Sequence, residues 1–105
     1  MGWSIKFQRF FFPNYTVIYF ELGGVITPDI LRKINVPKAY PKNGVIISGR
    51  GPIWLYCYLT HCYHYCAWVA THDPRLGAVI VQSHTPDKEV GEIIPFDLPE
   101  ELLED

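Results

Sequence analysis

The hydrophobic pattern in the first quarter of the chain is typical of two neighbouring strands. SIKFQRFFF alternates roughly between apolar and polar residues, and YTVIYFEL is rich in β-branched and aromatic residues. Pro13-Asn14 lies between the two runs, and such a pair favours a turn. The pattern therefore predicts an N-terminal β-hairpin that ends at Gly23-Gly24.

Two helices are expected after the hairpin. The first opens in TPDILRKI, where Thr27 suits the N-cap and Pro28 the first helical position. The second follows GVIISGRGP, which predicts a buried strand from Val45 to Ser48, a tight glycine turn and a helix start at Pro52. We expect this second helix to cover residues 53–65.

The rest of the chain predicts further strands. An apolar strand from Ala67 to Asp73 ends at DPRLG, whose Asp-Pro pair favours a turn. AVIVQSH follows as its hairpin partner, and GEIIPFDL adds an edge strand. Together the elements predict one small α/β (α+β) domain with a mixed sheet over residues 1–97. Residues 98–105 form an acidic C-terminal tail that we expect to lie in solvent.

Length and composition limit the chain to one small domain with surplus aromatic surface. Its 105 residues are too few for two domains, and a core of this size often gains from dimerisation. Aromatic residues make up 15%, more than such a domain usually buries, so some of them are expected to meet a partner chain or a ligand. The formal charge of -2 excludes a general basic surface for long DNA or RNA, but it leaves a short or enclosed anion open.

Three cysteines, Cys57, Cys62 and Cys66, lie close together in the chain. No N-terminal secretory signal precedes them, so we expect a cytoplasmic protein with reduced thiols. Their spacing contains no C-x-x-C, and ligands from one helix cannot surround a zinc ion, so packing as small hydrophobes is the favoured role. The apolar run from Pro52 to Ala70 carries a threonine, histidines and many tyrosines, which argue against a membrane span.

The sequence SGRGP joins a strand end to a helix start, where an anion is favoured. Backbone N–H groups at a helix N-terminus lack intrahelical partners, the helix dipole attracts negative charge, and Arg50 adds a fixed positive charge. A phosphate is therefore one interpretation. The alternative is a tight turn whose glycines serve steric needs.

All four histidines fall between positions 61 and 84. His61 and His64 are three residues apart in the expected second helix, so their side chains share a face and can serve one site. His84 follows Gln82-Ser83 at the end of a strand and is a further site candidate.

Asp73 and Arg75 flank a proline at the carboxyl end of a strand, where ligand sites collect in sheets of this kind. An ordinary Asp-Pro turn with a local ion pair is the alternative interpretation. His72 should point to the opposite face of the sheet from Asp73, so we expect its role to be structural.

Three segments, GVIISGRGPIWLY, HCYH and DPRLGAVIVQSH, together resemble the type III CRISPR accessory family Csx3, a family of ring nucleases that act on cyclic tetra-adenylate. The resemblance extends from the N-terminal hairpin to about Gly91, with departures at Tyr56 and Thr71-His72. It implies a ferredoxin-like domain that dimerises and holds the cyclic ligand between two dimers, in a tetramer or larger assembly. It also implies Mn²⁺-dependent cleavage of RNA phosphodiesters.

The resemblance also implies roles for individual residues. The ligand-holding group would be Ser48, Gly49 and Arg50, with His61 and His84 in support, and the catalytic group would be His64, Asp73 and Arg75. His64 would act as base or acid, Asp73 would hold Mn²⁺ with His64 or orient a histidine, and Arg75 would pair with the phosphate. If His64 and Asp73 come from different subunits, a monomer lacks a complete site.

Three other functions fit parts of the same pattern. A module that binds or sequesters the messenger without turnover would need Ser48, Gly49 and Arg50 but not His64. A deadenylating exonuclease on short RNA 3′ ends would use the same residues and would require an open path for a linear strand. A purely structural dimer would require none of this chemistry.

Overall fold

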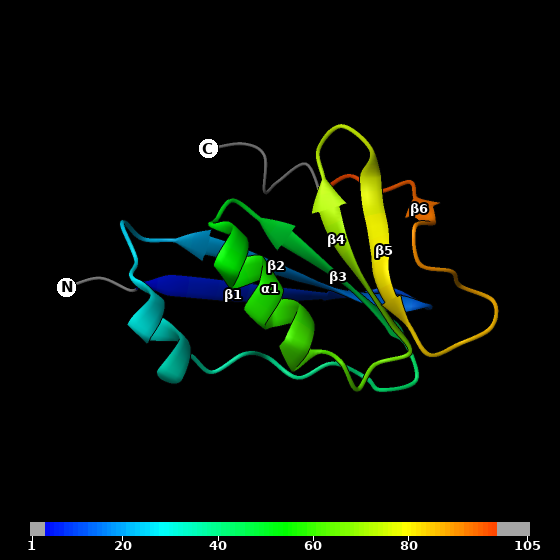
Figure 1. Cartoon of the computed structure of the whole chain (residues 1–105), viewed down its shortest axis with the longest axis horizontal. Helices are drawn as coiled ribbons and strands as arrows, with labels where there is room; N and C mark the ends of the chain where they lie inside the picture. Colours follow the sequence, from blue (N-terminus) through cyan, green and yellow to red (C-terminus); the bar gives the residue numbers. More distant parts are fainter. Residues whose placement is uncertain (1–3, 99–105) are drawn as a thin grey trace.

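Six strands form one mixed sheet whose order follows the sequence (Figure 1). The structure is a computed structural model that describes residues 4–98. Its strands are β1 (Ile5–Phe11), β2 (Tyr15–Leu22), β3 (Gly44–Gly49), β4 (Trp68–Asp73), β5 (Gly77–Ser83) and β6 (Ile93–Ile94). The three strands β2, β3 and β4 are parallel, and all other neighbouring pairs are antiparallel. The predicted mixed sheet is confirmed.

The predicted N-terminal hairpin is confirmed as well. β1 and β2 pair from Ile5 opposite Leu22 to Phe11 opposite Thr16. The chain reverses at Pro13-Asn14, where the N–H of the preceding phenylalanine donates to the carbonyl oxygen of the residue that starts β2. β2 then lies between β1 and β3, which explains why its sequence is nearly continuously apolar.

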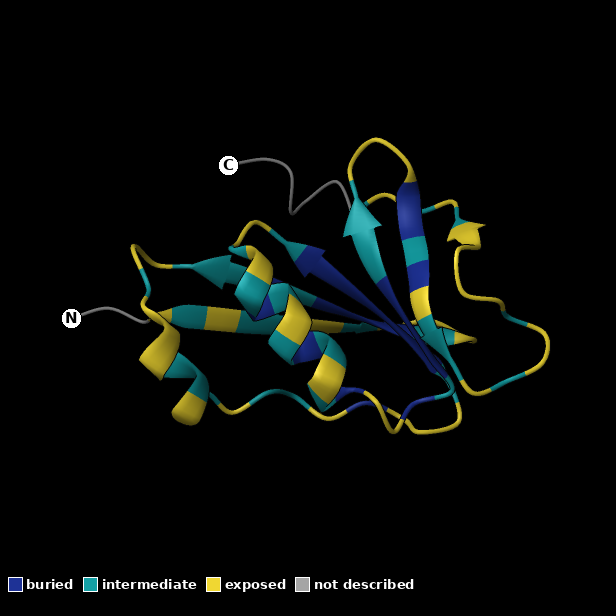
Figure 2. Cartoon of the chain, in the orientation of Figure 1, coloured by how far each residue is buried: buried dark blue, intermediate teal, exposed yellow. Residues whose placement is uncertain are grey.

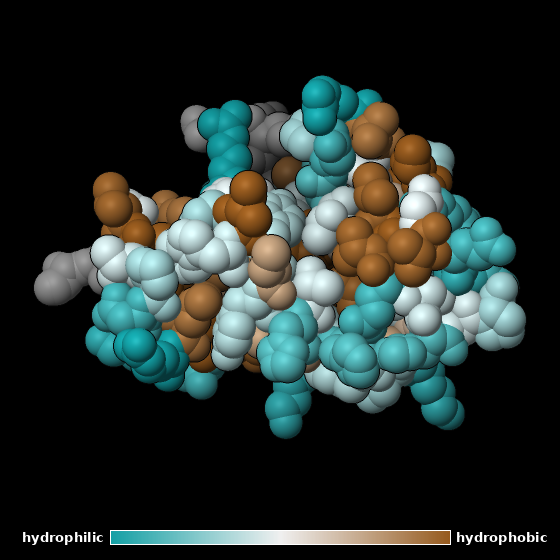
Figure 3. All heavy atoms as spheres, viewed as in Figure 1, coloured by the Kyte–Doolittle hydropathy of each residue, from teal (hydrophilic) through white to brown (hydrophobic). Residues whose placement is uncertain are grey.

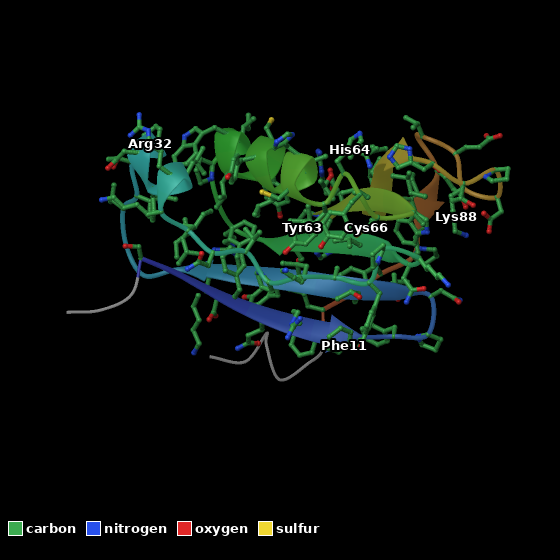
Figure 4. The ribbon with its side chains drawn as sticks, turned by 90° about the horizontal axis from the view of Figure 1, so that it is seen from below. Phe11, Arg32, Tyr63, His64, Cys66 and Lys88 are labelled. Carbon is green, nitrogen blue, oxygen red and sulfur yellow. The ribbon has the colours of Figure 1, made fainter. Side chains whose placement is uncertain are left out.

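One α-helix and one short 3-10 helix cover the same face of the sheet (Figure 4). The α-helix, α1 (Ile53–Cys62), is the crossover between the parallel strands β3 and β4. Leu55 and Leu59 lie one turn apart on it and are both fully buried against the sheet. The 3-10 helix, η1 (Pro28–Arg32), lies in the longer connection between β2 and β3 and contacts α1.

The structure corrects the prediction of two helices. The segment TPDILRKI forms only the five-residue η1, and the Thr27 hydroxyl bonds to the Asp29 carboxylate instead of capping a backbone N–H. α1 ends at Cys62, before the predicted end at residue 65. The ferredoxin-like arrangement is not confirmed, because its split βαβ units insert a strand between parallel neighbours. Here β3 and β4 pair directly.

Two hydrophobic clusters fill the two faces of the sheet. Figure 2 shows the strand between them, β3, coloured as buried along most of its length. Under α1, the buried side chains include Ile18, Phe20 and Ile47. On the opposite face they are Val17, Ile46, Trp68, Ala70, Ala78 and Ile80, with partly buried residues that include Phe96 packed against them. The central strand β3 is therefore buried on both sides.

The predicted edge strand in GEIIPFDL is confirmed only for the two residues of β6, which pair with β5. Of the predicted acidic tail, residues 98–105, only Leu98 lies within the described residues. No helix in the described part of the chain has the length and apolar character needed to cross a membrane.

Candidate functional site

The loop from β3 to α1 presents backbone donors and a free cation. The N–H groups of Leu55 and Tyr56 both donate to the carbonyl oxygen of Pro52, so the two helical residues before them have no intrahelical acceptor. Arg50 is exposed, and its side chain forms no hydrogen bond or ion pair with the residues that the structure describes. Both features favour an anion at this corner.

Packing fixes the start of this loop at Gly49. The residue has a φ of 147°, and a Cβ there would collide with the backbone and ring of Phe20 on β2. The Tyr56 hydroxyl donates to the Gly49 carbonyl oxygen at 2.6 Å, and burial raises the pKa of Tyr56 to about 12. The steric interpretation of SGRGP is therefore correct for this glycine. The case for an anion rests on the N–H groups and on Arg50.

The turn DPRLG is closed by Asp73. Its carboxylate accepts a hydrogen bond from the Arg75 N–H at 2.8 Å and lies 3.4 Å from that guanidinium. The backbone hydrogen bond from Arg75 is the main reason that the pKa of Asp73 lies below its usual value. The local ion pair of the alternative interpretation is thus present. Exposed pairs of this kind contribute little to stability, so an anionic ligand has little to compete with for Arg75.

These two loops lie at the same end of the sheet, as Figure 1 shows. β3 and β4 are parallel neighbours, so their carboxyl ends are adjacent. The structure therefore brings the backbone positions of five expected site residues to one end of the sheet, which we call the strand-end site: Ser48, Gly49, Arg50, Asp73 and Arg75.

The expected histidines gather elsewhere. His64, which Figure 4 labels, follows the end of α1, and its ring centroid lies 4.9 Å from that of His84 after β5. The His64 carbonyl oxygen lies 3.0 Å from Nε2 of His84 and accepts a hydrogen bond from the Gln82 amide at 3.1 Å. His61 is exposed on the last turn of α1, beside Tyr58. We call His61, His64 and His84 the histidine end. The prediction that His61 and His64 share a helix face is wrong, because α1 ends at Cys62 and only His61 lies in the helix.

The length of β4 separates the two groups. Asp73 is the last residue of this strand, whereas the Ala67 carbonyl just before its first residue pairs with the backbone N–H of His84. Five steps along a strand span about 17 Å. Within one chain, the structure therefore does not bring His64 to Asp73.

Sequence reasoning missed a contact at the strand-end site. The Ser48 side chain is 1% exposed, and its hydroxyl lies 2.8 Å from Nδ1 of His72. It thus points into the protein and away from solvent. His72 lies on the sheet face away from α1, with its ring edge-on to Phe96 at 5.0 Å. Alternation along each strand places both residues on this face, but only the pairing of β3 with β4 brings them together.

The three cysteines differ in burial, and none of them belongs to a metal-binding group within residues 4–98. All three thiols are free; Cys66 is buried, with a pKa raised to about 11 by burial, whereas Cys57 is exposed. The expected role as small hydrophobes is therefore correct for Cys66 and wrong for Cys57. Within residues 4–98, no three His, Cys, Asp or Glu side chains are grouped so that they could hold a metal ion.

An apolar hollow lies beside the strand-end site, and Figure 3 shows hydrophobic side chains gathered over β5 near it. Its lining includes Ile53 and Cys57 of α1, Val81 of β5 and Gly51 of the β3–α1 loop. Ile53 is 81% exposed, unusual for a large apolar side chain in a helix that packs on a sheet. Exposed apolar surface of this kind suits contact with another chain.

Comparison with known proteins identifies the family. A family model described as "CRISPR-associated protein (Cas_csx3)" matches residues 19–95, most of the chain. The chain belongs to the Csx3 family. An uncharacterised protein of Aquifex aeolicus (strain VF5) is 43% identical over 100 residues, which cover 90% of this chain and 87% of that protein. The match confirms the resemblance seen in the sequence.

Family membership makes the chain a CRISPR-associated protein, and the family match includes both groups of expected site residues. The strand-end site and the histidine end lie wholly within the part of the chain that matches the Csx3 model. All of β1 and the first half of β2 precede the matched residues.

Proposed function

We propose that the protein is a ring nuclease that binds and cleaves cyclic tetra-adenylate and so switches off type III CRISPR antiviral signalling. The observation that carries this proposal is the strand-end site in a Csx3 family member. Free N–H groups and the exposed Arg50 lie in the loop after β3, and Arg75 lies beside the ionised Asp73 carboxylate in the turn after the neighbouring strand β4. A small cyclic anion needs only a few such donors, repeated by symmetry, which a chain of net charge -2 can provide.

The reaction class follows from what RNA cleavage requires. The 2′-oxygen of one nucleotide attacks the adjacent phosphorus as the bond from phosphorus to the 5′-oxygen breaks. A base takes the 2′-hydroxyl proton, an acid returns one to the 5′-oxygen, and cations stabilise the added negative charge. We assign one of the two proton transfers, as base or acid, to His64, the other to solvent water, and the charge stabilisation to Arg75, with Arg50 holding a neighbouring phosphate.

The separation of the two groups makes this a proposal about an assembly. One chain holds His64 and Asp73 at opposite ends of β4, so a complete site takes the histidine end of one subunit and the strand-end site of another. The exposed Ile53 and Val81, which both line the apolar hollow, support association into a homodimer, and the ligand would join dimers into a tetramer.

Manganese fits the chain only in part. Asp73 supplies an ionised oxygen ligand of the kind Mn²⁺ prefers, but the described part of a single chain groups no further ligands around it. His64 of another subunit and the phosphates of the ligand would have to complete the set. We therefore propose Mn²⁺ as an activator and assign the chemical steps to the chain's own residues.

Incubation with cyclic oligoadenylates of different ring sizes, with and without Mn²⁺, tests the proposal. We expect linear products from cyclic tetra-adenylate, resolved by chromatography, and faster cleavage with the metal. Tight binding without products would favour the sequestering module. Shortening of linear oligoadenylate 3′ ends, with the ring left intact, would favour the deadenylating exonuclease.

A further inference from the structure

We propose that His72 is a positioning residue that joins the two halves of the strand-end site through its contact with Ser48. The role deepens the proposed function and rests on it. The contact lies at the carboxyl ends of β3 and β4, immediately before the Arg50 loop and the turn closed by Asp73.

The pairing between β3 and β4 ends before these loops begin, although β3 stays paired with β2 to Gly49 and β4 stays paired with β5 to Asp73. The last aligned pair of β3 and β4 is Ile47 opposite Thr71, one position short of Ser48 and His72. The Ser48 hydroxyl lies 2.8 Å from His72 Nδ1, so a side-chain contact links β3 to β4 one residue beyond the last backbone pair. The contact therefore bears on the spacing of the two loops at the point where they leave the sheet.

Burial deprives the Ser48 hydroxyl of water as an alternative hydrogen-bond partner. The Ser48 hydroxyl is buried and has a hydrogen-bond partner, whereas Thr16 holds the only buried side-chain oxygen or nitrogen without one among residues 4–98. Removing the His72 nitrogen would leave the Ser48 hydroxyl unpaired in a dry environment, which is costly. The contact is thus maintained unless the strand ends move.

Other elements hold the His72 ring in place. Phe96 packs edge-on against it from the segment after β6, and Ala78 of β5 lies opposite it in the sheet. Burial lowers the pKa of His72, while the carboxylates of Asp97 and Asp73 oppose that shift. The serine hydroxyl can donate or accept, so it can pair with Nδ1 in either tautomer of the ring.

Three substitutions separate a positioning role from simple packing. His72→Phe keeps an aromatic ring against Phe96 but removes Nδ1. His72→Asn places an amide where Nδ1 was, whereas His72→Gln places it near the former Nε2. The matched control is Ile46→Val, which trims the same face of β3 two residues before Ser48 without touching the contact.

The experiment measures single-turnover cleavage of cyclic tetra-adenylate and calorimetric affinity for an uncleavable analogue. We expect His72→Phe and His72→Gln to lower the rate by roughly 10- to 100-fold, the scale of a misplaced catalytic group. His72→Asn should recover most of that loss, and Ile46→Val should keep the wild-type rate. Equal rates for the Asn and Gln variants, or a wild-type rate for His72→Phe, would overturn the proposal.

A second pair of measurements keeps this inference distinct from the proposed function. Without ligand, backbone amide NMR signals of Gly49, Arg50 and residues 73–76 should shift in His72→Phe and not in Ile46→Val. If the wild-type protein neither binds nor cleaves cyclic adenylates, the proposed function fails, and these signals still decide whether the contact links the loops. In activity, Ser48→Ala combined with His72→Phe should be no worse than either alone. Additive losses would mean that Ser48 acts without His72, and would overturn the proposal.

Discussion

The strand-end site and the histidine end differ in how firmly the fold holds them. At the strand-end site, packing and hydrogen bonds to the backbone fix the loops. Gly49 packs against Phe20, and its carbonyl oxygen accepts a hydrogen bond from Tyr56. Asp73 accepts a hydrogen bond from the backbone of its own turn. At the histidine end, the side chains of His64 and His84 are exposed. The two rings contact each other, and the His84 ring also contacts the His64 carbonyl oxygen.

This difference suggests a division of labour. A fixed backbone that presents N–H groups and carries two exposed arginines suits the holding of a ligand that must always bind in the same place. The exposed imidazoles after α1 and after β5 suit proton transfer once a second subunit and the ligand bury them. The four predictions below test that division, beginning with the largest expected effect.

Loss of either reacting group should stop turnover and leave binding largely intact. We expect His64→Ala to lower the single-turnover rate by roughly 100-fold or more, the usual scale for a general acid or base. Asp73→Ala should do the same, because its carboxylate is assigned to the metal or to a histidine. Calorimetry with an uncleavable ring checks that the ligand still binds. A large loss of affinity in His64→Ala would place the histidine end among the holding groups.

Mixing the two inactive variants should restore cleavage if the groups belong to different subunits. Some mixed assemblies would then pair an intact His64 from one chain with an intact Asp73 from another. The matched control mixes His64→Ala with the double variant that also lacks Asp73, and it should stay inactive. Subunit exchange is verified by light scattering and mass labelling. Exchange without any recovery would mean that each chain completes its own site after a rearrangement.

Arg50→Ala should weaken binding more than it slows the bound complex. It removes a charge-assisted contact to a phosphate, which is typically worth about 1.5–3 kcal/mol. Calorimetric titration with the uncleavable ring measures the change. Arg32→Ala, an exposed arginine at the end of η1, serves as the charge-matched control. Equal affinities for the two variants would mean that SGRGP is an ordinary tight turn and not an anion site.

Gln82→Ala should have the smallest effect. It removes the amide that donates to the His64 carbonyl oxygen, a neutral hydrogen bond worth about 0.5–1.5 kcal/mol. We therefore expect a two- to tenfold slower single turnover, roughly the rate equivalent of that energy, with affinity unchanged. The control is Thr85→Ala, whose hydroxyl contacts Asp87 in the next loop. A normal rate for Gln82→Ala would show that His64 needs no support from β5.

The sequence predicted those helices, strands and turns that depend on interactions between residues close together in the chain. The β1–β2 hairpin, the strand that precedes SGRGP, α1 and the DPRLG turn were all predictable, because apolar periodicity and turn residues act over a few positions. The segment TPDILRKI shows the limit of such signals. Its start carries the expected helix residues, yet η1 is only five residues long and buries none of them, so packing supplies little support for a longer helix.

The sequence by itself determined which residue types are available for chemistry and how each is placed on its own strand or helix. Alternation alone put His72 and Asp73 on opposite faces. Tertiary structure decided which of these residues meet. Parallel pairing of β3 with β4 placed the Arg50 loop and the Asp73 turn at one end of the sheet and brought Ser48 to His72, and the length of β4 kept His64 away. Such contacts depend on strand order, which links segments more than 20 residues apart and leaves no local signal in the chain.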